Sequence, residues 1–165
     1  MASATAAKSA STCRWCAANS YAAQAGSANC TGCPRGTFNR SLGASSAAHC
    51  GLCRAGTYGV AGLGKGCADC DAGTASSAVG ATRAEDCSSC GSGRFAPAGS
   101  PSCRSCAPGY YATNNATDSD AIGEGVGASL CRECPGGRYN GKNDSIGCKV
   151  CAAGKASSAA STHCT

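Results

Sequence analysis

The chain has 165 residues, a formal net charge of +5, 24 glycines and 17 cysteines. Only twelve of its side chains are Leu, Ile, Val or Phe, too few for burial of apolar surface to offset the conformational entropy of folding. The composition therefore excludes a domain built on a conventional hydrophobic core. Cysteines are the available substitute, because cross-links restrain the unfolded chain.

The N-terminal segment, residues 1–12, reads as a flexible arm, because it is rich in Ala and Ser and carries no periodic apolar pattern. It also lacks the apolar run of a signal peptide. We therefore interpret the numbering as that of a fragment of a longer precursor, or of a mature segment whose first residues are not native. No stretch is long and apolar enough to span a membrane, so any anchor is expected outside these residues.

From Cys13 onward the chain repeats. Eight Cys-x-x-Cys pairs follow in series, beginning with Cys13/Cys16, and a lone Cys164 stands where a ninth pair would start. Residues 13–164 are therefore predicted to be one tandem cysteine-rich repeat array. We number its units 1 to 8 as residues 16–30, 33–50, 53–67, 70–87, 90–103, 106–131, 134–148 and 151–164.

Each unit carries the same two marked positions. The third residue after the opening cysteine is Asn19 in unit 1 and glycine in the other seven: Gly36, Gly56, Gly73, Gly93, Gly109, Gly137 and Gly154. Glycine and asparagine enter left-handed backbone conformations most cheaply, so a positive φ is predicted there in every unit. Two positions later an aromatic ring stands in six units, and alanine replaces it at Ala75 and Ala156. Each unit thus has little besides one ring to pack.

Helices are not expected, because glycine or proline interrupts almost every ten-residue window. Each unit is expected to be a short, irregular β-hairpin with a turn near a second glycine, for instance Gly26, Gly43, Gly62, Gly80 or Gly99. The predicted fold class is small and disulfide-rich, an elongated tandem array of such hairpins with little or no helix. Units that contact only their neighbours would stack into a rod of roughly 80 Å.

Two disulfide patterns fit the spacing. The serial pattern closes each unit on itself and leaves Cys13 for an upstream partner. Its pairs are Cys16–Cys30, Cys33–Cys50, Cys53–Cys67, Cys70–Cys87, Cys90–Cys103, Cys106–Cys131, Cys134–Cys148 and Cys151–Cys164. The crossed pattern joins first to first and second to second, as in Cys13 with Cys30, and leaves Cys164 alone. We favour the serial pattern because each glycine turn then lies within a closed loop.

Other cysteine chemistry fits less well. A four-thiolate zinc array remains an alternative, although the cysteine count is odd and the interval from Cys106 to Cys131 is long. Haem attachment requires a histidine directly after a pair, and none is present. Neither a catalytic Cys/His nor a paired-carboxylate arrangement can be argued, so the chain is expected to be no enzyme and to need no cofactor.

Four sequons, at Asn29, Asn39, Asn115 and Asn143, are candidate glycosylation sites. The Asn29 sequon has a cysteine as its middle residue, which makes it the weakest of the four. Together with the cysteines they favour a secreted or cell-surface chain in an oxidising compartment.

Charge is concentrated at the N-terminal end. The first 68 residues carry six basic and no acidic side chains (+6), whereas residues 69–165 carry eight basic and nine acidic ones (−1). Arg35, Arg40 and Arg54 are therefore candidate binding residues for an acidic polysaccharide or an acidic protein surface, with solvated charges as the simpler alternative. Nucleic-acid binding is not expected, because the basic residues are sparse and the rings occupy repeat positions.

The repeat motif resembles the cysteine-rich repeats of ephrin-type tyrosine-kinase receptors. In that pattern, Cys-Pro-x-Gly-Thr-Phe/Tyr is followed by a turn and Gly-Ala-Ser/Thr. The matching segments are residues 33–38, 43–45, 80–82 and 127–129. Residues 134–148 resemble, more distantly, the first loop of a tumour necrosis factor receptor repeat, and serial arrays of this kind are also similar to surface proteins of protists and algae. The resemblance implies an extracellular scaffold and does not specify a ligand.

We therefore expect an extracellular structural or adhesive repeat module that acts as a scaffold in a surface or filament assembly. Its partners would be other extracellular proteins, copies of itself or an acidic polysaccharide. The first alternative is a ligand-binding segment of a cell-surface receptor ectodomain. The second is the zinc-binding array.

Overall fold

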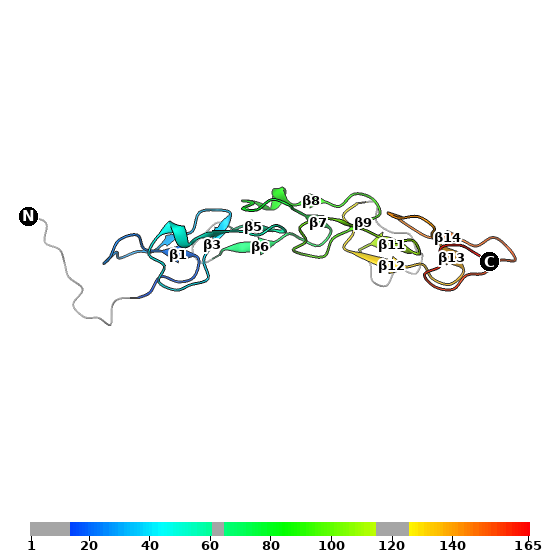
Figure 1. Cartoon of the computed structure of the whole chain (residues 1–165), viewed down its shortest axis with the longest axis horizontal. Coiled ribbons are helices and arrows are strands. Elements are labelled where there is room, and N and C mark those ends of the chain that lie inside the picture. The colour runs from blue at the N-terminus through cyan, green and yellow to red at the C-terminus, as the bar shows by residue number, and fades with distance from the viewer. Residues whose placement is uncertain (1–13, 61–64, 115–125) are drawn as a thin grey trace, which may run out of the picture.

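Short antiparallel hairpins follow one another along the whole molecule. The computed structural model describes residues 14–60, 65–114 and 126–165. Units 1 to 7 each contribute one two-stranded sheet, and the units succeed one another in chain order along the long axis, from the blue end to the red end (Figure 1). The predicted elongated array is confirmed.

The sheets share one construction. The outgoing strand begins at or directly after the predicted positive-φ residue, and the return strand contains the two residues between the cysteines of the next Cys-x-x-Cys pair. The strand pairs are β1 (Ser20–Tyr21) with β2 (Thr31–Gly32), β3 (Thr37–Phe38) with β4 (Gly51–Leu52), β5 (Thr57–Gly59) with β6 (Cys67–Asp69), β7 (Thr74–Ala75) with β8 (Ser88–Ser89), β9 (Arg94–Phe95) with β10 (Arg104–Ser105), β11 (Tyr110–Thr113) with β12 (Leu130–Glu133), and β13 (Arg138–Tyr139) with β14 (Lys149–Val150).

Helix is almost absent from the described residues. They contain two single turns of 3-10 helix, η2 (Ala47–His49) and η3 (Ala84–Asp86). Both lie directly before the cysteine that closes their unit. The expectation of little or no helix is confirmed, and it follows from the density of glycine.

Both predicted turn positions adopt the left-handed backbone region. All eight residues at the third position have a positive φ, from 60° at Asn19 to 85° at Gly109. At the second turn, Gly26, Gly43, Gly80 and Gly99 also have positive φ, whereas the predicted turn at Gly62 lies outside the described residues. The later units use Gly127, Asp144 and Ala160 at this turn.

Consecutive units are joined by backbone hydrogen bonds rather than by a hydrophobic interface. Between units 3 and 4, Gly56 N–H donates to the Ser76 carbonyl (2.7 Å), Gly59 N–H to that of Ala81 (2.8 Å), and Gly80 N–H to that of Cys53 (2.8 Å). The same three bonds recur between units 1 and 2, 4 and 5, 6 and 7, and 7 and 8, and two of them recur between units 5 and 6. The junction therefore depends on backbone N–H and C=O groups rather than on side chains.

The expectation that units contact only their immediate neighbours is wrong. In units 4 to 8 the second turn also lies against the unit two places before it. A Cβ added to Gly36, Gly56 or Gly73 would collide with the backbone of Gly80, Gly99 or Gly127, and Gly93 and Gly109 face Asp144 and Ala160 in the same way. Glycine is thus required twice at this position, for its φ and for the close approach.

Small apolar clusters form around the disulfides. Tyr111, only 1% exposed, packs with Cys134 and Cys148, which belong to the next unit. Phe95 likewise packs against the cluster that contains Cys106 and Cys131. The ring of one unit therefore covers the disulfide of the following unit, which is how a chain with so few apolar residues buries any of them.

Candidate functional site

Eight disulfides cross-link the described residues, and their pattern is the serial one. They are Cys16–Cys30, Cys33–Cys50, Cys53–Cys67, Cys70–Cys87, Cys90–Cys103, Cys106–Cys131, Cys134–Cys148 and Cys151–Cys164, with Cα–Cα distances of 5.6 to 5.8 Å. Cys13 lies outside the described residues. The distances fall within the range that a disulfide requires.

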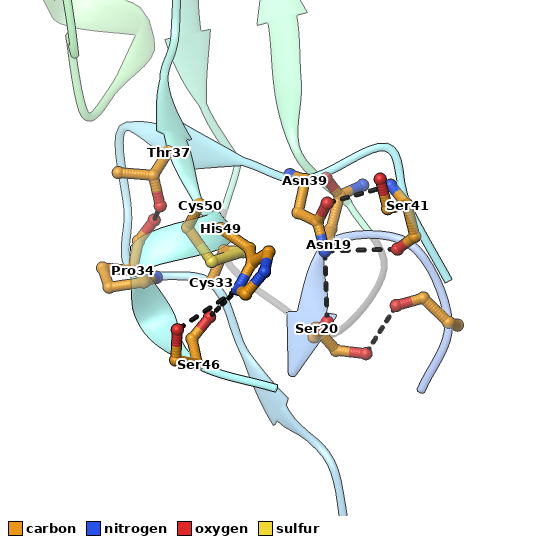
Figure 2. Close-up of a disulfide and its surroundings, with 11 residues drawn as sticks. Asn19, Ser20, Cys33, Pro34, Thr37, Asn39, Ser41, Ser46, His49 and Cys50 are labelled. Carbon is orange, nitrogen blue, oxygen red and sulfur yellow. Dashed lines mark hydrogen bonds between the residues drawn. A yellow bond between two sulfur atoms is a disulfide. The ribbon is translucent and has the colours of Figure 1, made fainter. Parts of the chain in front are cut away.

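The pairing follows from local geometry. The two residues inside each pair lie on an extended return strand, where side chains three positions apart point to opposite faces. The first cysteine can therefore close the unit behind it while the second opens the unit ahead. Figure 2 shows the disulfide Cys33–Cys50, beside which His49 Nδ1 lies 3.2 Å from Ser46 Oγ.

The oxidised state also bears on metal binding. A sulfur in a disulfide offers no thiolate, so these sixteen cysteines cannot serve as zinc ligands while they are bonded. Within residues 14–60, 65–114 and 126–165 there is no cluster of three or more His, Cys, Asp or Glu side chains that could hold a metal ion.

The candidate glycosylation residues differ in accessibility. Asn29 and Asn143 are exposed, and Asn115 lies outside the described residues. Asn39 is only 5% exposed; its Nδ2 donates to the carbonyls of Ser41 (3.2 Å) and Ser20 (3.5 Å), and its Oδ1 accepts from Ser41 N–H (2.9 Å), part of the network in Figure 2. A glycan on this Nδ2 would have no room in the folded unit.

A cleft of about 430 Å³ lies where units 1, 2 and 3 meet. Unit 1 contributes Ala18 and Asn19, unit 2 contributes residues 38–40, and unit 3 contributes Arg54, Thr57 and residues 65–67, with Asp69 on the following return strand. Two of the three candidate binding residues, Arg40 and Arg54, line this cleft. Arg35 is exposed and does not line it.

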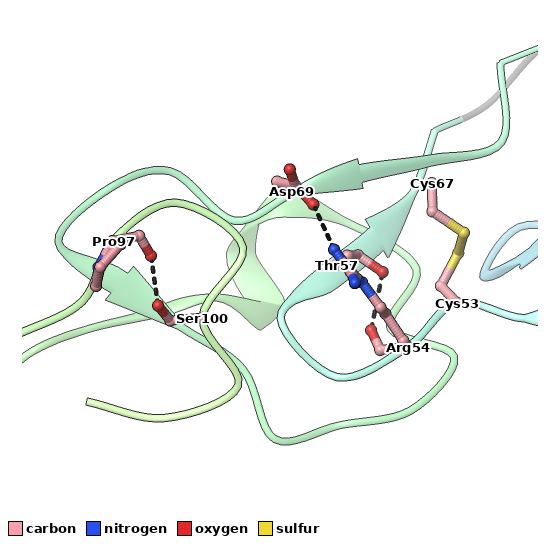
Figure 3. A network of polar contacts seen from close by, with 7 residues as sticks. All are labelled: Cys53, Arg54, Thr57, Cys67, Asp69, Pro97 and Ser100. Carbon is pink, nitrogen blue, oxygen red and sulfur yellow. Dashed lines mark hydrogen bonds and ion pairs between the residues drawn. A yellow bond between two sulfur atoms is a disulfide. The ribbon is translucent and has the colours of Figure 1, made fainter. Parts of the chain in front are cut away.

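Each cation of the cleft has a different environment. The guanidinium carbon of Arg40 lies 5.4 Å from the centre of the Phe38 ring, within cation–π range. Arg54 Nη2 lies 3.7 Å from Asp69 Oδ1 (Figure 3), in a pair whose side chains are 78% and 58% exposed, so solvent weakens it. Lys65 forms no ion pair with any described residue.

The sequence pattern missed Lys65 and the role of Phe38. Lys65 is the last basic residue of the stretch without acidic side chains, which is the one signal it carries in the sequence. The sequence predicts Phe38 as the aromatic ring of its repeat. Only Arg40, two residues later, indicates that the ring could also contact a cation.

No helix in the described part of the chain is both long enough and apolar enough to cross a bilayer.

Comparison with known proteins identifies the repeat. Residues 4–50 match the family model described as tyrosine-protein kinase ephrin type A/B receptor-like, whereas a search of curated proteins found no match. The matched region includes units 1 and 2, and the same disulfide-closed unit recurs as far as Cys151–Cys164. The family consists of non-catalytic extracellular modules. Residues 4–50 are therefore similar to a cysteine-rich repeat of the ephrin receptor-like family, and the serial disulfides support a repeat of this kind, which points to an extracellular receptor-type module.

Proposed function

We propose that the chain is a structural or adhesive scaffold, a rod that holds extracellular partners at fixed positions in a surface or filament assembly. The observation that carries this proposal is the recurring junction, in which equivalent backbone hydrogen bonds join six pairs of consecutive units among the described residues. A chain selected to form one specific globular site would not need the same junction so many times.

The junctions favour a stiff rod over a string of flexible beads. Three backbone hydrogen bonds contribute about 1 kcal/mol each, and the disulfide within every unit keeps the bonded segments in place. The contact between a unit and the unit two places before it adds a second support. Bending at one junction would disturb both sets of contacts, because the same turn takes part in both: Gly80 N–H donates to the Cys53 carbonyl, and the Gly80 carbonyl faces Gly36.

Small-angle scattering of the disulfide-bonded chain tests the proposal. We expect the distance distribution of a rod, with a maximum dimension well above the diameter of about 40 Å of a compact domain of this length. A variant lacking residues 134–165, which removes units 7 and 8, should be shorter with an unchanged cross-section. A compact distribution for the full chain would rule out the scaffold role.

The alternative function is that of a ligand-binding segment in a cell-surface receptor ectodomain. The family match over residues 4–50 supports this alternative, since it is to receptor-like modules. In either case we place the protein at the cell surface or in the secreted fraction, with other extracellular proteins or copies of itself as partners. Sedimentation velocity distinguishes copies of the chain from other proteins as partners, because self-assembly would make the sedimentation coefficient rise with concentration.

A further inference from the structure

The cleft between units 1, 2 and 3 has the dimensions of a ligand site. Its volume of about 430 Å³ lies within the range of about 300–1,000 Å³ that is typical of small-molecule pockets. Its walls come from three units, so it exists only in the stacked array. Its lining combines an aromatic ring with charged groups, a mixture suited to an amphipathic polar ligand.

The charge of the lining is positive. Arg40, Arg54 and Lys65 line the cleft together with a single carboxylate, that of Asp69. The first 68 residues contain no acidic side chain to offset the cations, and in the described residues neither Arg40 nor Lys65 forms an ion pair. Bringing like charges together is unfavourable, and a bound anion would relieve that repulsion.

The cleft is also held in shape before any ligand arrives. Asn19 N–H donates to the Asn39 carbonyl (2.7 Å), and Asn39 N–H donates back to Asn19 Oδ1 (3.0 Å), which fixes unit 1 on unit 2 beneath the cations. Phe38 supports the Arg40 guanidinium from one side. Because these groups are already ordered, binding would lose less conformational entropy than at a surface of free side chains.

We propose that this cleft binds the carboxylate of an acidic sugar, a uronate residue of an extracellular glycan. Arg40 and Lys65 donate charge-assisted hydrogen bonds to the carboxylate, and the exposed part of the Phe38 ring contacts the apolar face of the sugar. A lone Asp or Glu side chain of a protein partner would fill too little of the volume. Asp69 competes with the ligand for Arg54.

Titration of the intact chain with hyaluronan hexasaccharide, followed by amide chemical shifts and calorimetry at low salt, tests the proposal. Chitohexaose, which has no carboxylate, is the neutral control. Binding should be saturable, should shift the amides of Phe38 to Arg40 and Lys65 to Asp69, and should weaken as salt increases. Arg40→Ala and Lys65→Ala should each weaken binding about tenfold or more, as expected for a lost charge-assisted hydrogen bond.

Arg35→Ala is the matched control. Arg35 belongs to the same unit and the same basic end but does not line the cleft, so its removal should change the affinity less than about threefold. Asp69→Asn should increase the affinity, a gain that misfolding cannot imitate. An equal loss from Arg35→Ala and Arg40→Ala, binding of chitohexaose at the same affinity, or no binding of the hexasaccharide would overturn the proposal. None of these outcomes affects the scattering test of the rod.

Discussion

Gly56→Ala tests the contact between units two places apart. Gly56 has a φ of +82°, and a Cβ there would collide with the backbone carbonyl of Gly99 in unit 5. Gly137→Ala is the matched control, because Gly137 has a φ of +78° but nothing within 4 Å of the added Cβ. In both variants the left-handed backbone should lower the free energy of unfolding by about 1–2 kcal/mol. Only in Gly56→Ala should overpacking lower the free energy of unfolding by about 1–3 kcal/mol more.

Hydrogen exchange on the disulfide-bonded chain measures this difference locally, which matters because a long repeat array need not unfold in one step. The reporter is the Gly99 N–H, which donates to the Cys70 carbonyl at 2.8 Å. An additional 1–3 kcal/mol corresponds to roughly 5- to 150-fold faster exchange at Gly99 in Gly56→Ala. Unchanged protection of Gly99, with a stability loss equal to that of Gly137→Ala, would refute the packing of units two places apart.

Peptide mapping without reductant should recover the eight serial disulfides, and a peptide joining the first cysteines of two neighbouring pairs would contradict them. In a glycosylating host, glycopeptide analysis should find Asn143 modified and Asn39 unmodified, because only the first is exposed; a glycan on Asn39 would argue against the buried amide. Tyr111→Ala should destabilise the chain by about 3–4 kcal/mol in denaturant unfolding, since the ring is buried against a disulfide. Tyr110→Ala, at an exposed neighbour, should cost under about 1 kcal/mol, and similar losses for both would show that the ring does not form the cluster.

Features that depend on short spacing could be predicted from the sequence. The positive φ at Asn19 and at the seven glycines follows from the chemistry of those residues, and the hairpins follow from the disulfide-closed loops between pairs. These are local properties, since each is decided within about 20 residues. The small number of large apolar residues makes this local structure easier to predict, because no hydrophobic core competes with the local pattern.

Features that depend on how units are oriented could not be predicted. Lys65 lies 25 residues after Arg40 in the chain. It lines the same cleft because units 1, 2 and 3 are stacked so that the adjacent Gly66 approaches Asn19 of unit 1. Arg35 is nearer to Arg40 in the sequence than Lys65 is, and yet it does not line the cleft. Sequence spacing alone contains no information on how consecutive units are oriented relative to one another.

The burial of Asn39 was signalled but not recognised. Asn39 and Asn140 both directly follow the aromatic position of their units, and both are 5% exposed. In each case Oδ1 accepts an N–H two residues ahead, from Ser41 and from Lys142. A sequon records only that Ser or Thr follows at the right distance. The repeat alignment places a second asparagine, Asn140, at this position outside any sequon, which points to a structural use for the residue there.

The candidate site coincides with the one unit that departs from the glycine rule. Elsewhere the second turn rests directly on a bare glycine two units before it, which leaves no space between them. In unit 1 the residue is Asn19, whose side chain approaches Gly66 of unit 3: a Cβ on Gly66 would lie 2.8 Å from Asn19 Nδ2. Asn19 and Gly66 both line the cleft. Local sequence rules in repeat proteins are most often broken where function requires it, and here the exception lies beside Arg40 and Lys65.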